Sequence, residues 1–368
     1  MSEFTVKTYD ETLLKSKYDS YVLGADIGGT NTNLAIAGIK GLKPQLLFSC
    51  HFKTQKLESV IPSINKTLEY AAEKHGITIE YACIGAAGVV NASKYFVKLT
   101  NASWNISKKE ILEKTLLKNI LLLNDFQIIG YGINLLNPNN QNDIFQIRQT
   151  PEISTHTTKA IIGAGTGLGK SILIYDKNLN AYIPLPSEGG HTDTPVYNNK
   201  ELELLDFIKK QIGCNKPVTY EEIVSGRGLE NIYQYVRNKQ QLQPTLYTEE
   251  IDNSDEKASL ISKYKETDEN CKETFKIFTK FYARCIKNFV LDTMSTGGIY
   301  ITGGIAAKNK EIFTTKEFCE ELENAHQRND VLKNIPIYVI VNYDVSLLGA
   351  CLAAMHSMIQ NNKSKILS

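Results

Sequence analysis

Hydrophobic residues in the first part of the chain form short apolar runs separated by turns that contain glycine. Runs over residues 21–26, 33–39 and 45–52 predict three successive strands of a β-meander. Apolar residues then recur at helical spacing over residues 60–72, and Gly76 stands where it can end that helix. This pattern predicts a meander followed by a helix at the start of an α/β domain.

The pattern then alternates between strands and helices and repeats its opening plan. Further strands are predicted over residues 81–88, 120–125, 159–167, 169–176, 181–185, 298–302 and 335–341. Helices are predicted from about 108 and over 201–212, 273–294 and 345–360, and residues 238–272 predict a solvated helix-loop segment. Two copies of one plan predict two facing lobes with a cleft between them.

Composition and length agree with this organisation. The chain has 368 residues, 42% of them hydrophobic and 22% charged, which is typical of a globular protein with two or more domains. We expect an N-terminal extension over 1–20, a small α/β domain over 21–124 completed by the helix 345–360, and a large α/β domain over 125–344. The net charge of +1 gives no support for a nucleic-acid or membrane partner, so small-molecule chemistry is the expectation.

The seven cysteines indicate the compartment. Their number is odd, their spacing is wide, and no CxxC pair occurs, so neither a disulfide framework nor zinc is expected. Cys83, Cys285 and Cys351 lie in apolar runs, as buried free thiols do in a reducing environment. The N-terminus lacks the apolar core of a signal peptide, and no apolar stretch reaches the roughly 18 residues of a membrane helix. We therefore expect a cytoplasmic protein.

The first candidate site is the turn Asp26-Ile-Gly-Gly-Thr-Asn31, which lies between two predicted strands. Its glycines allow a tight turn whose backbone amides approach an anion, so the turn can hold phosphate. A carboxylate beside phosphate needs an intervening cation, which makes Asp26 a candidate Mg²⁺ ligand, directly or through water. A plain hairpin turn is the alternative.

A second glycine-rich turn covers residues 163–169. Leu168 stands where a dinucleotide-binding fingerprint requires glycine, and Ala164 stands where a P-loop has its first glycine. A P-loop must also open a helix, whereas residues 171–175 (SILIY) read as a strand. We reject both patterns and predict a second strand-turn-strand phosphate clamp.

Eight motifs, taken together, resemble the bacterial-type glucokinase family over roughly residues 21–355. They are ADIGGTN (25–31), TNASWNIS (100–107), LNDF (123–126), GAGTGLG (163–169), PSEGGHTD (186–193), EEIVSGRGLENIY (221–233), ITGGIAAK (301–308) and IYVIVNYDVSLLGA (337–350). The resemblance implies a two-lobed, duplicated actin-like ATPase (ribonuclease H-like) α/β fold with an active-site cleft between the lobes. It implies ATP-dependent phosphorylation of D-glucose on its 6-hydroxyl, and a homodimer.

The resemblance also implies individual roles. Asp125 matches the general base, which would accept the proton of the sugar hydroxyl; the alternative is that Asn-Asp only caps the next helix. The implied sugar ligands are Asn101, Asn124, Asp125, Glu188, His191 and Glu221. The implied ATP contacts are Ala25, Asp26, Ile27, Gly28, Gly29, Thr30, Asn31, Gly165, Thr166, Gly167, Gly303 and Gly304. No cysteine-rich zinc loop follows His191, and we assign no role to His51, His75 or His326.

Two other functions stay open on sequence grounds. The same fold could phosphorylate mannose, fructose or an amino sugar. A non-catalytic sugar sensor is the other alternative, although Asp26 and Asp125 are both present and no DNA-binding helix pair precedes Tyr21. Consumption of ATP when sugar is added would separate the enzyme from the sensor.

Overall fold

The chain forms two compact units, each with its own hydrophobic core. The computed structural model describes residues 4–9, 11–14, 17–91, 96–99, 102–150, 156–213, 215–239 and 243–367. The first unit combines Met1–Asn137, Tyr175–Pro186 and Asn342–Ser368, and the second combines Pro138–Ile174 and Ser187–Val341. Within the described residues, no helix has both the length and the apolar composition that crossing a membrane requires.

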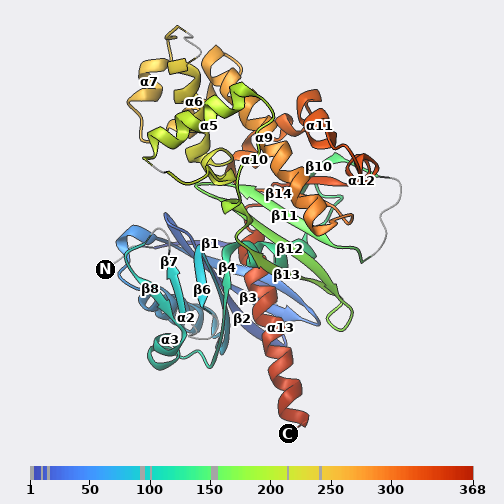
Figure 1. Cartoon of the computed structure of the whole chain (residues 1–368). Coiled ribbons are helices and arrows are strands. Elements are labelled where there is room, and N and C mark those ends of the chain that lie inside the picture. Colours follow the sequence, from blue (N-terminus) through green and yellow to red (C-terminus); the bar gives the residue numbers. More distant parts are fainter. Residues whose placement is uncertain are drawn as a thin grey trace. The chain divides into compact units, whose positions relative to one another are not determined.

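A six-stranded sheet in the order β1-β4-β3-β2-β5-β9 is the centre of the first unit. Figure 1 labels its strands β1, β2, β3 and β4. Its strands are β1 Thr5–Thr8, β2 Ser20–Ile27, β3 Asn31–Lys40, β4 Lys43–Lys53, β5 Tyr81–Ala86 and β9 Asn119–Asn124. Strands β2, β3 and β4 are antiparallel, whereas β2, β5 and β9 are parallel. A smaller sheet contains β6 Gly88–Asn91, β7 Phe96–Leu99 and β8 Asn105–Ser107.

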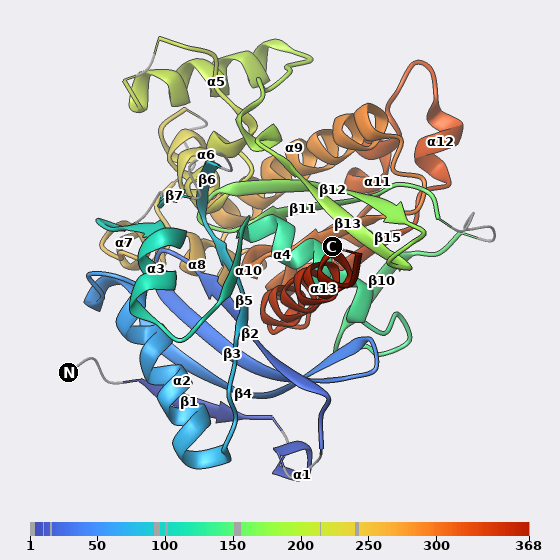
Figure 2. The same ribbon diagram turned by 90° about the horizontal axis from the view of Figure 1, so that it is seen from below.

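Helices cover both faces of this sheet because its side chains alternate between two apolar clusters. Leu23 belongs to the cluster that contains residues of α2, and the adjacent Val22 belongs to the cluster that contains residues of α4 and α13. Figure 2 shows α2 and α13 on opposite sides of the sheet. The helices and 3₁₀ turns of this unit are α1 Glu11–Leu14, η1 Thr54–Lys56, α2 Ile61–His75, α3 Lys108–Lys114, α4 Asp125–Gly132, η2 Ile133–Leu135 and α13 Val345–Leu367.

A second six-stranded sheet has the order β10-β15-β14-β11-β12-β13. Its strands are β10 Ile144–Arg148, β11 Lys159–Ala164, β12 Leu168–Asp176, β13 Ala181–Ser187, β14 Ile299–Thr302 and β15 Ile337–Ile340. The helical elements of the second unit are η3 Gly189–His191, α5 Asn199–Gln211, η4 Tyr220–Glu222, α6 Gly226–Lys239, α7 Thr248–Asp252, α8 Lys257–Lys263, α9 Glu269–Thr293, α10 Gly304–Lys308, η5 Lys310–Thr314, α11 Lys316–Glu323 and α12 Asn329–Lys333.

The two sheets repeat one plan. In the first sheet β2 pairs antiparallel with the next strand, β3, and parallel with the later strand β5. In the second sheet β11 pairs antiparallel with β12 and parallel with β14. The predicted duplicated α/β architecture is therefore confirmed. Residues 168–176 form a strand and not the start of a helix, which also confirms the rejection of the P-loop.

The N-terminal residues differ from the expected extension. Strand β1 pairs with β4 at the edge of the first sheet, and the Lys7 ammonium lies 2.6 Å from the Asp344 carboxylate. All four residues of β1 are exposed, so no apolar alternation marks this strand in the sequence. Strand β1 is held by backbone pairing with β4, so residues 5–8 are part of the folded first unit.

Two further boundaries differ from expectation. The first unit extends to Asn137 because α4 packs on α13 and β5, so α4 does not open the second unit. The expected solvated segment 238–272 contains α7 and α8, whose Ile251 and Ile261 are fully buried. Each short helix contributes one apolar anchor, and one anchor is too few to produce a periodicity that the sequence reveals.

Helices α4 and α13 approach each other through glycine. A Cβ added at Gly349 of α13 would lie 1.7 Å from the Ile128 carbonyl oxygen, and one added at Gly132 of α4 would lie 2.1 Å from the Val345 carbonyl oxygen. Such distances leave no room for a side chain. The contact fixes α4, the helix that begins at Asp125.

Replacing Gly349 with alanine tests this contact. Alanine has the higher helix propensity, by about 1 kcal/mol, so a helix without the contact would gain stability. We expect the opposite, a loss of about 1–3 kcal/mol and a melting temperature lowered by several degrees, because the added methyl overpacks the interface. Differential scanning calorimetry measures this shift. Asn362→Ala, at an exposed position of the same helix, is the control, and an equal or higher melting temperature for Gly349→Ala would contradict the packing.

Candidate active site

In the first unit, three parallel strands bring the predicted residues to one edge of the sheet. Ile27 at the end of β2 is in register with Ala86 at the end of β5, and Ala86 is in register with Asn124 at the end of β9. The turn after β2 and the start of α4 are therefore two strand spacings apart, about 10 Å. Ligands of α/β proteins bind at such carboxyl ends of strands.

The first glycine turn, residues 26–31, is stabilised by a hydrogen bond within the turn and by hydrogen bonds from Thr54 and Gln55. The Gly28 N–H donates to the Asn31 carbonyl at 2.9 Å, and the Thr54 hydroxyl donates to the Gly28 carbonyl at 2.8 Å. The Gln55 side-chain amide donates to the carbonyl of the next glycine at 2.9 Å. The carbonyls of the turn are thus engaged by the protein. Ala25 and Ile27 are buried, whereas Thr30 and Asn31 are exposed.

Asp26 is the one acidic side chain of this turn. Burial raises the pKa of its carboxyl, and a hydrogen bond from the Ser346 hydroxyl at 2.6 Å opposes that effect. This bond engages Oδ2 only. A half-buried carboxylate beside a hydroxyl offers the hard oxygen ligands that Mg²⁺ prefers, and a cation would offset the cost of ionising it. The residues present therefore fit a magnesium ion. Sequence reasoning missed Ser346 because it lies 320 positions away.

Asn124 and Asp125 begin α4. Asn124 is the N-cap, its side chain accepts from the Phe126 N–H at 2.9 Å, and Gln127 completes a capping box. Asp125 is the first helical residue, and its Oδ1 also accepts from Phe126 at 3.0 Å. The capping alternative thus holds for Asn124, and it leaves Asp125 at a helix N-terminus, where the backbone dipole favours a negative charge.

The second glycine turn closes the β11–β12 hairpin. The Gly165 N–H donates to the Gly167 carbonyl at 2.8 Å, and Thr166 is exposed at the tip. Gly303 has φ +96°, and a Cβ there would lie 2.4 Å from the Ala164 carbonyl oxygen. The Gly303–Gly304 turn, predicted as an ATP contact, therefore lies directly beside the second glycine turn.

Glu221, in η4, contacts this turn through its carboxylate. One oxygen accepts from the Leu168 N–H at 2.9 Å, and the other accepts from the Arg227 guanidinium. A Cβ at Gly167 would lie 2.5 Å from the first oxygen, so only glycine permits this approach. Both oxygens of the predicted sugar ligand are engaged within the protein. Arg227 belongs to a quoted motif, but its charge pairing was not predicted.

Glu188 and His191 lie at the ends of the short loop through η3. Both side chains are exposed, and the His191 Nε2 lies 3.9 Å from a Glu188 carboxylate oxygen. A Cβ at Gly190 would lie 2.0 Å from the Leu168 carbonyl oxygen, so this loop also packs against the second glycine turn. The second unit thus places Glu188, His191 and Glu221 around one turn. Asn101 lies outside the described residues.

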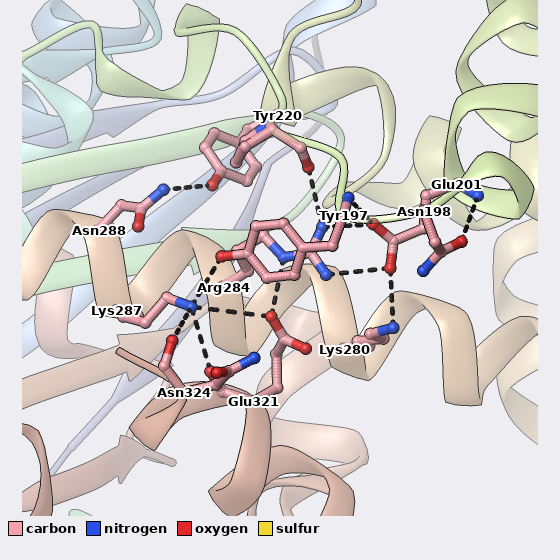
Figure 3. A network of polar contacts seen from close by, with 11 residues as sticks. Tyr197, Asn198, Glu201, Tyr220, Lys280, Arg284, Lys287, Asn288, Glu321 and Asn324 are labelled. Carbon is pink, nitrogen blue, oxygen red and sulfur yellow. Dashed lines mark hydrogen bonds and ion pairs between the residues drawn. The ribbon is translucent and has the colours of Figure 1, made fainter. Parts of the chain in front are cut away.

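A buried ion network fixes the chain after His191 (Figure 3). The Arg284 side chain is fully buried, lies 3.7 Å from the centroid of the Tyr197 ring, and donates to the Pro195 carbonyl at 2.8 Å. Its guanidinium also contacts the carboxylates of Glu201 and Glu321, each at 2.8 Å. This network joins α5, α9 and α11, and no sequence pattern predicts it.

Comparison with solved structures defines the class of fold. The chain is similar to a glucokinase from an Antarctic psychrotroph (TM-score 0.74, 22% identity, covering 92% of this chain and 100% of that chain). It is also similar to a glucokinase from Balamuthia mandrillaris in complex with glucose (TM-score 0.77, 21% identity, covering 91% and 93%). The duplicated sheets therefore have the actin-like ATPase fold of these sugar kinases, as predicted.

Sequence comparison defines the family. The glucokinase family model matches residues 23–357. A glucokinase from Trichormus variabilis is 30% identical over 349 residues, covering 90% of this chain and 98% of the relative. A glucokinase from Yersinia enterocolitica is 30% identical over 338 residues, covering 90% and 95%. The chain belongs to the glucokinase family, whose members are ATP-dependent kinases that phosphorylate glucose.

The Arg284 network predicts an acid-dependent stability. Burial alone would raise the pKa of Glu201, but hydrogen bonds from Arg284 and Lys280 lower it to about 2. A depressed pKa gives stability that is present above the unfolded value of about 4.3 and is lost as the pH falls toward 2. Glu201→Gln should therefore be less stable at pH 7, and the difference from wild type should shrink below about pH 4.

Urea midpoints measured between pH 7 and pH 3 check this behaviour. Glu203→Gln, an exposed position of the same helix, is the matched control and should follow wild type throughout. A constant difference between Glu201→Gln and wild type over the whole range would show that the carboxylate charge is not what stabilises the network.

Proposed function

We propose that this chain transfers the γ-phosphoryl group of ATP to the 6-hydroxyl of D-glucose with Asp125 as the general base. The observation that carries this proposal is the strand edge of the first unit, where a glycine turn and a helix-initiating aspartate lie two strands apart. Membership of the glucokinase family supports the reaction, and the geometry supports the assignment of roles.

Asp125 suits a base because Asn124, and not Asp125, is the N-cap of α4, although Asp125 Oδ1 also accepts from the Phe126 N–H. The capping box of Asn124 and Gln127 holds the first turn of α4. Gly349 of α13 has no side chain, which allows α13 to pack closely against α4. The carboxylate would accept the proton of the 6-hydroxyl as the oxygen bonds to phosphorus. A fixed position lowers the entropic cost of reaching that geometry.

Hydroxyl-rich substrates need hydrogen-bond acceptors as well as donors. Glu188 and His191 are exposed side chains on one loop, and each can accept from a sugar hydroxyl. Asn124 and Asn101 are proposed as further ligands. Glu221, with both oxygens engaged, would contact the sugar only through a rearranged pairing with Arg227. We therefore propose Glu188 and His191 as the principal ligands of the second unit.

The glycine turns supply the phosphate contacts in this proposal. Residues 25–31 are proposed to hold the terminal phosphates of ATP, residues 165–167 are proposed as further ATP contacts, and Gly303–Gly304 are proposed as contacts on the adenosine side. Asp26 and Ser346 would hold Mg²⁺, directly or through water. When bound, the ion would neutralise charge on the phosphate oxygens.

We also propose a cytoplasmic homodimer. Cys83, Cys285 and Cys351 are fully buried free thiols, which suits a reducing compartment. The dimer follows from the family resemblance alone, and sedimentation analysis of the purified chain tests it.

Replacing Asp125 with asparagine tests the base. The helix cap remains, because Asn124 provides it, so folding should be intact. We expect kcat to fall by about 10²- to 10⁴-fold while the Kd for glucose changes little, because the base acts on the proton only during transfer. A coupled assay of glucose 6-phosphate measures kcat, and calorimetry measures the Kd.

Asp330→Asn, an exposed carboxylate, is the control and should keep wild-type turnover. Wild-type turnover in Asp125→Asn would place the base elsewhere. The same assay run on glucose, mannose, fructose and an amino sugar at equal concentration determines whether glucose is the preferred hexose.

Replacing Asp26 with asparagine tests the magnesium ligand. The raised pKa of Asp26 means that its ionisation destabilises the folded chain. This cost is absent below the unfolded pKa of about 3.9, grows as the pH rises toward the folded pKa, and is complete above it. Asp26→Asn should therefore melt higher than wild type at pH 8, and this gain should disappear on acidification. Activity at limiting Mg²⁺ should fall about 10- to 100-fold.

Melting curves and a Mg²⁺ titration of activity check the two effects separately. Asp19→Asn, an exposed aspartate of the same unit, should alter neither. A variant that melts lower at pH 8 would refute the burial cost, and an unchanged Mg²⁺ dependence would exclude Asp26 as the ligand.

A further inference from the structure

A hollow lies in the second unit beside the η3 loop. It has a volume of about 560 Å³, within the roughly 300–1,000 Å³ of small-molecule sites. Ser187, Gly189 and Thr192 line it, whereas Glu188, His191 and Glu221 do not. The hollow is therefore lined by residues other than the proposed sugar ligands.

Its floor contains Lys170, the lysine of the rejected P-loop pattern. Only 4% of this residue is exposed, and it forms no ion pair with a carboxylate among the residues that the structure describes. Its ammonium lies 5.3 Å from the Tyr220 ring centroid and 5.0 Å from that of Phe289. It also lies near the Cys285 thiol, where its charge opposes the rise that burial causes in the thiol pKa. Ring faces and a thiol offset only a small part of the free-energy cost of burying a cation. Lys170 therefore still favours a negatively charged acceptor.

Tyr220 provides a second donor on the floor. Its hydroxyl oxygen accepts from the Asn288 side-chain amide at 2.8 Å (Figure 3), and its own hydrogen has no acceptor among the described residues. Burial raises the pKa of this phenol, so it stays a neutral O–H donor. An ammonium and a hydroxyl thus line one floor, both able to donate.

Two carboxylates restrict what can enter. Asp193 and Asp292 line the same hollow and are exposed, whereas Lys170 and Tyr220 are buried. A ligand with negative charge spread over its whole length would be repelled at the mouth. A small anion whose charge is concentrated at one end fits this arrangement.

We propose that this hollow is a binding site for a small carboxylate or phosphate anion, whose oxygens accept from Lys170 and Tyr220. A Cβ at Gly189 would lie 2.9 Å from the Lys170 Cδ, so the lysine stem directly abuts the η3 loop. An anion that draws Lys170 toward itself shifts that loop. Occupancy should therefore change the KM for glucose, a consequence that rests on the proposed function.

Binding is tested directly by calorimetry on the full chain. Inorganic phosphate and acetate are titrated separately, which distinguishes the two anion chemistries. Saturating glucose and the ATP analogue AMPPNP are present, so that the glycine turns are not available to either probe. We expect at least one probe to bind, and its affinity to fall about 10- to 100-fold in Lys170→Met, because a charged hydrogen bond is lost.

Two further variants distinguish an anion site from a structural lysine. Asp193→Asn should bind the same probe more tightly, because it removes repulsion at the mouth. Lys170→Met should melt no lower than wild type without ligand, because methionine fills the space of the stem without a buried charge. A structural lysine would instead lower the melting temperature when it is removed.

The proposal is overturned if neither probe binds wild type at concentrations up to about 10 mM, or if Lys170→Met binds as wild type does. Because binding is measured without turnover, these outcomes are independent of whether Asp125 is the base. If a probe binds but the KM for glucose is unchanged, the site stands and its coupling to the η3 loop is refuted.

Discussion

In both units a glycine turn joins a strand to its antiparallel neighbour while a parallel strand lies on the other side. Parallel pairing forces the carboxyl ends of β2, β5 and β9 to one edge, and the pairing of β11 with β14 does the same in the second unit. Every proposed phosphate contact and the proposed base depend on this constraint, because it gathers residues about 100 positions apart. Glycine is required in these turns where another group lies too close for a Cβ, as the Glu221 carboxylate does at Gly167.

Close packing of α4 against α13 fixes the position of Asp125, the proposed base. Helix α4 begins at the strand edge, and its path is set by backbone contact with α13, where Gly132 and Gly349 replace side chains. The same helix α13 carries Ser346, which hydrogen-bonds Asp26. One C-terminal helix therefore supports both proposed halves of the first unit's site. A domain that lacked α13 would lose both the packing of α4 and the hydrogen bond to Asp26.

Buried charges in the second unit are of two kinds. Arg284 is matched by two carboxylates and a carbonyl, and so fixes the segment after His191. Lys170 is nearly as buried, but among the described residues it forms no ion pair, and its ammonium lies near two ring faces and a thiol. A satisfied network of the first kind stabilises a fold, whereas an unmatched cation beside a hollow provides a place for an anion. The contrast is visible only when the partners of each charge are known.

The sequence alone determined the longer strands of both six-stranded sheets, the duplicated plan and the two glycine turns, because apolar periodicity and glycine are local signals. It did not predict the short strands β6, β7, β8 and β10. It also indicated the family, because eight motifs occur together in one chain. Tertiary structure decided what local signals do not carry: β1, which has no apolar alternation; α4, which groups with α13 and not with the second unit; and the partners Ser346, Arg227 and Arg284. Asn124 is an example: the sequence left open whether Asn124 and Asp125 only cap the next helix, and the structure shows that Asn124 is the N-cap. Long-range pairing sets these contacts, and no pattern along the chain specifies which distant side chain will arrive.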